Sequence, residues 1–95
     1  MLRKFRVGRL VATPGALEVI EELEGSGGGG AGEFVNRHLR GDWGEVSEED
    51  AAANDAAVED GSRILSAYDA GDGRRLWLIT EADRSSTCIL LPDEY

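Results

Sequence analysis

The last third of the chain sets the strongest constraint on its fold. Three apolar segments follow one another at residues 63–68, 75–81 and 86–91, and short polar stretches separate them. These stretches are Ala70-Gly71-Asp72-Gly73 and Ala82-Asp83-Arg84-Ser85. Short β-rich segments joined by such stretches are typical of antiparallel hairpins. The sequence therefore predicts a three-stranded antiparallel meander, and the Asp83–Ser85 region is interpreted as its second turn rather than as an active site.

Three helices are predicted before the meander. Thr13 followed by Pro14 is typical of a cap and first helical position, and this helix runs to about Glu24. A second, short helix is predicted over residues 33–40, where Gly41 stops it. Ser47 can cap a third helix whose first turn is acidic and which ends near Gly61.

The segment from Phe5 to Ala12 alternates imperfectly between apolar and basic residues, which indicates an extended segment that joins the sheet. A chain of 95 residues suits a single small domain. The predicted fold is thus α+β over residues 1–95: an N-terminal extended segment, three helices, and a three-stranded antiparallel meander packed against the helices. The central strand is apolar on both sides, so its second face meets the N-terminal arm, a second subunit in a homodimer, or both.

A glycine-rich run occupies residues 25–32. A phosphate-binding loop needs a preceding strand and a Gly-Lys-Ser/Thr ending, whereas this run follows a predicted helix and continues into Glu33-Phe34. We interpret it as a flexible loop within the domain.

Charge is distributed unevenly within a net charge of −9. Residues 14–62 carry thirteen acids against two arginines, and residues 63–95 carry six acids against four arginines. The basic residues of the first thirteen positions are Arg3, Lys4, Arg6 and Arg9. An acidic surface repels phosphate and attracts basic partners, so we expect an interaction with a basic protein and no direct nucleic-acid binding.

The residues that usually carry catalysis are sparse. His38 lies on or beside the apolar side of the second helix, and it could react only with Asp83, Arg84 and Ser85 in one pocket. Cys88 is expected to be a small buried apolar residue. With one histidine and one cysteine, a zinc site would draw half of its ligands from carboxylates. We therefore expect no catalytic residues, no metal and no cofactor.

Partner contacts are the remaining candidate sites. Trp43 follows a turn, and it either packs into one end of the core or anchors a partner. The candidate acidic contacts lie on the first and third helices: Glu18, Glu21, Glu22, Glu48, Glu49 and Asp50. No secretory signal or membrane-length apolar run is evident, so a cytoplasmic location and no membrane contact are expected.

Four stretches resemble a known family: VGRLVATPGALE, RHLRGDWGE, GSRILSAY and LWLITEADRSSTCILLPDEY. Together they span nearly the whole chain, which is similar to a family of small bacterial proteins called plasmid-related, also labelled type I restriction endonuclease subunit M. The chain lacks the length and the Asn-Pro-Pro-Tyr-type motif of a methyltransferase subunit. Its glycine run departs from the family pattern.

These observations favour a small acidic, non-enzymatic protein-interaction module of mobile-element type. The alternative is an acidic DNA mimic that inhibits a restriction or CRISPR nuclease by occupying its basic DNA channel. That alternative requires the acidic side chains of the first and third helices to be spaced like duplex phosphates.

Overall fold

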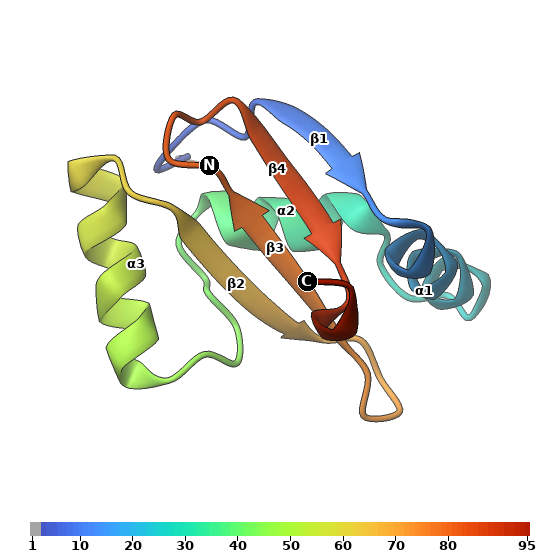
Figure 1. Ribbon diagram of the computed structural model, residues 1–95. Helices are drawn as coiled ribbons and strands as arrows, with labels where there is room; N and C mark the ends of the chain where they lie inside the picture. The colour runs from blue at the N-terminus through green and yellow to red at the C-terminus, as the bar shows by residue number, and fades with distance from the viewer. Residues whose placement is uncertain (1–2) are drawn as a thin grey trace.

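The computed structural model describes residues 3–95, which form an α+β fold with three α-helices around one four-stranded sheet (Figure 1). The strands are β1 (Arg9–Ala12), β2 (Ile64–Asp69), β3 (Arg75–Thr80) and β4 (Ser86–Leu90). The helices are α1 (Pro14–Gly25), α2 (Ala31–Leu39), α3 (Glu48–Asp60) and the short 3₁₀ helix η1 (Pro92–Glu94).

The sheet is mixed, with strand order β1-β4-β3-β2. The predicted meander is present, because β3 pairs antiparallel with both β2 and β4. The N-terminal segment joins the sheet as predicted, where β1 is a fourth strand beside the three-stranded meander. It pairs parallel with β4, with Arg9 opposite Ser86, so the sheet as a whole is mixed rather than an antiparallel meander alone. Only the end of the predicted extended segment is a strand, because Gly8 has a φ of 65° and breaks the extended backbone ahead of Arg9.

The helices begin and end close to the predicted positions, because their signals are local. The Thr13 hydroxyl accepts a hydrogen bond from Ala16 N, and the Ser47 hydroxyl accepts one from Asp50 N. Gly61 ends α3 in the left-handed conformation, with a φ of 80°. The glycine run is shorter as a loop than expected, since Gly25 belongs to α1 and Ala31 opens α2.

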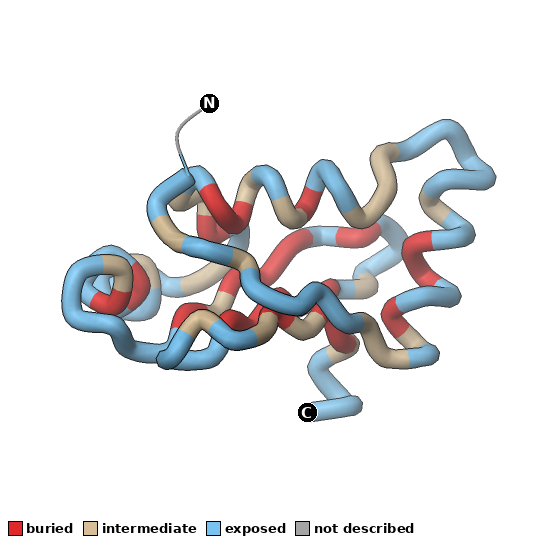
Figure 2. The backbone as a smooth tube through the Cα atoms, turned by 90° about the horizontal axis from the view of Figure 1, so that it is seen from above, coloured by how far each residue is buried: buried red, intermediate tan, exposed pale blue. Residues whose placement is uncertain are grey.

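One face of the sheet packs on α1 and α2. The larger core cluster lies here, and Figure 2 shows buried segments facing inward between the elements. Its buried residues are Ala16, Val19, Ile20, Phe34, Tyr68, Ala70, Leu76, Leu78 and Ile89. The side of α1 that faces the core carries Ala16, Val19 and Ile20, whereas Leu17 is 47% exposed.

A smaller cluster joins α3 to the β2 end of the sheet. Trp43, Ala57 and Ile64 are its buried members, and Phe5 packs against it. Figure 1 shows α3 beside β2 rather than across a face of the sheet. The outer edge of β2 is occupied at two points: Asn54 of α3 bonds both backbone groups of Leu65, and Ala67 bonds the backbone of Trp43 and Glu45.

The N-terminal arm, defined here as Arg3–Gly8, lies across one end of the core. Lys4 N donates to Leu39 O at 2.8 Å, and the Phe5 ring lies 5.1 Å from the ring of His38. Val7 O accepts a hydrogen bond from the Thr87 hydroxyl at 2.7 Å. The arm therefore covers the polar core residues that α2 contributes.

Candidate interaction surface

His38 does not meet the Asp83–Ser85 turn. Its Nδ1 lies 2.5 Å from Ser66 Oγ on β2, and its Nε2 lies 2.8 Å from Thr80 Oγ1 on β3. Thr80 Oγ1 lies 2.7 Å from Thr87 Oγ1 on β4. Each of these side chains is fully buried. A continuous line of polar groups thus crosses the core from β2 to the arm.

The end of this line fixes the direction of every hydrogen bond in it. Thr87 must donate to the carbonyl of Val7, so it accepts from Thr80. Thr80 then accepts from Nε2–H of His38, and Nδ1 accepts from the hydroxyl of Ser66. The network therefore assigns the neutral Nε2–H tautomer to His38. All of its members have partners, which explains how they are tolerated in an apolar core.

Burial is the main cause of an unusual pKa at His38. Desolvation, followed by the nearby positive charge of Arg84, lowers its pKa from 6.5 to about 4. A proton on Nδ1 would reverse the hydrogen bond with Ser66, whose hydroxyl can also accept, so the cost of the charged ring lies in its desolvation and in the charge of Arg84. The imidazole is thus held neutral inside a closed core, where a substrate has no access to it.

The turn between β3 and β4 is held by hydrogen bonds within the turn and by hydrogen bonds to the end of α3. The hydroxyl and backbone N–H of Ser85 bond Asp83 and hold the pKa of that carboxyl below its usual value. Arg84 has a φ of 60° and donates from Nη2 to Ala57 O and from Nη1 to Ser62 O. Arg84 therefore ties the turn to the carboxyl end of α3, where a positive charge is favourable.

Trp43 lies in the smaller core cluster, where it is 6% exposed. Its Nε1 donates to Asp55 Oδ1 of α3 at 3.0 Å. A direct contact between Trp43 and a partner would require that cluster to open. This position matches the first of the two interpretations of Trp43, a residue that packs into one end of the core.

The candidate acidic contacts fall into two groups at opposite ends of the sheet. Glu18, Glu21 and Glu22 lie on α1, which Figure 1 shows toward the β1 side, and Glu22 pairs with Arg74 of the β2–β3 turn. The first turn of α3 carries the other three, beside β2 (Figure 1). This separation does not favour one continuous row of charges spaced like the phosphates of a duplex. The DNA-mimic alternative therefore gains no support from their arrangement.

No α-helix of residues 3–95 lies across the second face of the sheet, and Figure 1 shows the C-terminal tail with η1 in front of it. The pairing register places Leu65, Ala67, Trp77 and Cys88 on this face. Cys88 is only partly buried, contrary to the expectation of a buried residue, whereas its pairing partner Ile79 on the same face is 3% exposed. The ring of Tyr95 lies 5.8 Å from that of Trp77 and covers part of the face.

A hollow of about 310 Å³ lies on this face, beside α3. We call it the open-face hollow. Its apolar residues come from β2, β3, η1 and the segment before α3, and its polar residues are two acids, one serine and one arginine. The lining residues are Val46, Leu65, Ala67, Trp77 and Pro92, with Glu45, Ser47, Asp50 and Arg75.

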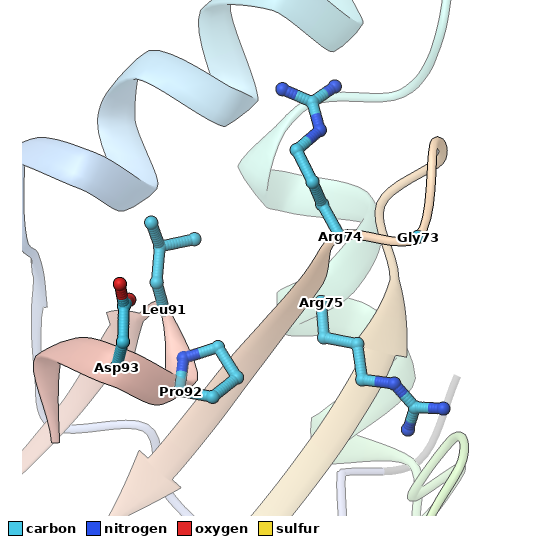
Figure 3. Close-up of a pocket in the computed structure, with 6 residues that line it drawn as sticks. All are labelled: Gly73, Arg74, Arg75, Leu91, Pro92 and Asp93. Atoms are coloured by element: carbon cyan, nitrogen blue, oxygen red, sulfur yellow. The ribbon is translucent and has the colours of Figure 1, made fainter.

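A second pocket, of about 370 Å³, lies between the β2–β3 turn and η1. Figure 3 shows that the two arginines in its wall diverge: Arg74 extends toward α1 and Arg75 away from it. Arg74 pairs with Glu22, and Arg75 lies 3.5 Å from a carboxylate oxygen of Glu45. Because these side chains do not converge, the pocket offers no paired cationic site for an anion.

Within residues 3–95, no group of three or more His, Cys, Asp or Glu side chains is placed to hold a metal ion. Over the same residues, no helix combines the length and apolar character that a membrane crossing requires. Comparisons of the chain with protein-family models, with curated proteins and with solved structures find no match in any of the three. The geometry described above is therefore the basis for a functional proposal.

Proposed function

We propose that this chain is a small acidic, non-enzymatic interaction module that binds a basic segment of another protein over the open-face hollow. The observation that carries the proposal is an apolar hollow on the face of the sheet that no α-helix of residues 3–95 covers, bordered by Glu45 and Asp50. Apolar anchors in pockets dominate the affinity of most protein interfaces, and charged rims set partner choice.

The charge around the hollow defines the chemistry of the partner. Three acids in the first turn of α3, Glu48, Glu49 and Asp50, are exposed, and that turn contains no basic residue. Arg75 is the cation in the lining, and it already lies beside Glu45. A partner segment with one large apolar side chain flanked by lysine or arginine fits this arrangement. The resemblance to plasmid-related proteins points to a partner encoded by a mobile element.

Two variants of equal charge test this proposal. Glu48→Lys with Asp50→Lys reverses the charge of Asp50, which lines the hollow, and of its neighbour Glu48 in the first turn of α3. Glu18→Lys with Glu21→Lys makes the same change in charge on α1. The intact protein captures its partner from an extract of the source cells, and calorimetry with the purified partner then compares the variants. We expect the α3 variant to weaken binding by about tenfold or more, because it replaces attraction with repulsion.

The α1 variant is the control, and we expect it to bind within about twofold of the wild-type protein. Thermal unfolding of both variants shows whether each is folded. Equal losses in the two variants would indicate a general effect of net charge and contradict the proposed site. A wild-type chain that captures no partner would contradict the proposed function itself.

A further inference from the structure

The β1 edge of the sheet exposes a concentration of apolar side chains. Among residues 3–95, the exposed large apolar residues are Leu10, Val11, Leu17 and Tyr95, and the first three lie in β1 or in the first turn of α1. Leu10 is 46% exposed and Val11 is 40% exposed. At the opposite edge, Asn54 and the Trp43–Glu45 segment cover β2. The β1 edge has no such cover in the described part of the chain.

The outer edge of β1 presents backbone N–H and C=O groups that a further strand could pair with. Arg9 N donates to Ser85 O and Thr13 N donates to Ile89 O, so these residues direct their backbone groups toward β4. Alternate residues of a strand direct these groups to the same side, so Leu10 and Ala12 direct theirs outward. Because β1 ends the sheet, no strand within residues 3–95 pairs with them. An unpaired edge of this kind is a template for another chain.

We propose that a second copy of this chain occupies the edge, with the two β1 strands antiparallel about a two-fold axis through Val11. Leu10 of each copy then opposes Ala12 of the other, and all outward backbone groups of both residues are bonded. An axis through Leu10 would oppose Ala12 to Gly8, whose φ of 65° takes it out of the strand. An axis through Ala12 would oppose Leu10 to Pro14, which has no N–H.

The side chains are complementary in this register. The two Val11 side chains meet on the axis, on the open face of the sheet. Arg9 of one copy opposes Thr13 of the other, whose hydroxyl lies 2.5 Å from the carboxylate of Glu94. Arg9 is exposed and has no ion-pair partner within residues 3–95, so its guanidinium is available to reach that carboxylate. Two symmetric Arg9–Glu94 pairs result.

This dimer goes beyond the proposed function and is independent of it. The hollow lies beside α3 and β2, at the other end of the strand order from β1. Pairing through β1 therefore leaves both hollows open and joins the two sheets into one. Loss of the dimer would not by itself abolish partner binding, and loss of partner binding would not abolish the dimer.

Analytical ultracentrifugation of the full chain over a range of concentrations tests the proposal. We expect a reversible dimer that Val11→Lys and Val11→Asp each weaken by about tenfold or more, because each places two like charges on the axis. An equimolar mixture of these two variants should recover the dimer, since lysine then faces aspartate. Ala52→Lys, on the exposed side of α3, is the matched control and should dimerise like the wild-type chain.

Disulfide cross-linking tests the register. In a Cys88→Ser background, Val11→Cys should cross-link on oxidation, because residues on the axis face each other closely. Leu10→Cys should cross-link much less, because Leu10 faces Ala12 rather than itself. A wild-type chain that stays monomeric up to about 1 mM would overturn the proposal, as would a dimer that Val11→Lys leaves intact. Cross-linking of Leu10→Cys at least as strong as that of Val11→Cys would overturn the register.

Discussion

At the scale of single residues, His38 shows what a polar side chain does in this core. The sequence places it on or beside the apolar side of a helix, and in the structure it is fully buried. Its partners Ser66 and Thr80 are 28 and 42 residues away in sequence. No local pattern identifies such partners, because strand register decides which hydroxyls face the ring. The line of hydroxyls joins α2, three strands and the arm.

The depressed pKa of His38 predicts a pH-dependent stability. The folded pKa of about 4 lies below the unfolded value of 6.5, so the unfolded chain binds the proton more readily. The stabilisation is complete above pH 6.5 and is lost as the pH falls toward 4. It amounts to about 3 kcal/mol. Urea unfolding at intervals between pH 7 and pH 4 measures this loss.

A His38→Gln variant provides the comparison for this measurement. Glutamine does not titrate, so the variant should be less stable at pH 7 but should lose less stability over the same interval. Asp42, Asp83 and Glu94 also have lowered pKa values, and their contributions are lost mainly below the ordinary carboxyl range. Identical pH profiles for the two proteins would contradict the assignment of a neutral, buried imidazole.

At the scale of elements, the ends of the helices could be predicted from neighbouring residues, whereas the pairing of distant strands could not. Thr13, Ser47 and Gly61 mark helix ends in the sequence and in the structure, since capping depends on neighbouring residues. The antiparallel meander of β2, β3 and β4 was also predictable, from its two turns. The parallel pairing of β1 with β4 was not, because it joins Arg9 to Ser86 across most of the chain. The position of α3 beside β2 depends on Asn54, which carries no distinctive local signal.

Asn54 is predicted to stabilise the β2 edge. Its side-chain amide donates to Leu65 O at 2.8 Å, and its carbonyl oxygen accepts from Leu65 N at 3.1 Å. Asn54→Ala removes both bonds and leaves the backbone of Leu65 unpaired in a partly buried setting. We expect a loss of about 2 kcal/mol in the free energy of unfolding, after allowing for the better helix propensity of alanine.

Urea unfolding compares this variant with Glu59→Ala, which changes an exposed residue of the same helix. The Glu59→Ala variant should lie within about 0.5 kcal/mol of the wild-type protein. Asn54→Asp retains the acceptor but brings a carboxylate oxygen against the carbonyl oxygen of Leu65 in a nearly buried position, so it should destabilise at least as much as Asn54→Ala. If Asn54→Ala and Glu59→Ala unfold at the same urea concentration, Asn54 does not secure this edge.

At the scale of the whole molecule, the positions of the acidic residues and of the open-face hollow do not follow from composition. The chain is acidic as a whole, yet the acids on α1 and those on α3 lie at opposite ends of the sheet. The sequence predicts that β3 is apolar on both sides, and Trp77 on its second side lines the open-face hollow. The hollow itself was not predictable, because its residues come from segments separated in sequence and brought together by strand order.

Hydrogen exchange of the intact chain, alone and with its captured partner, tests the central claim most directly. If a basic segment occupies the open-face hollow, protection will increase in residues 45–50 and at the exposed backbone of residues 91–95, near Trp77 and Pro92. Exchange in α1 should not change. Protection that instead appears over α1, or that does not change near the hollow while the partner is bound, would contradict the account.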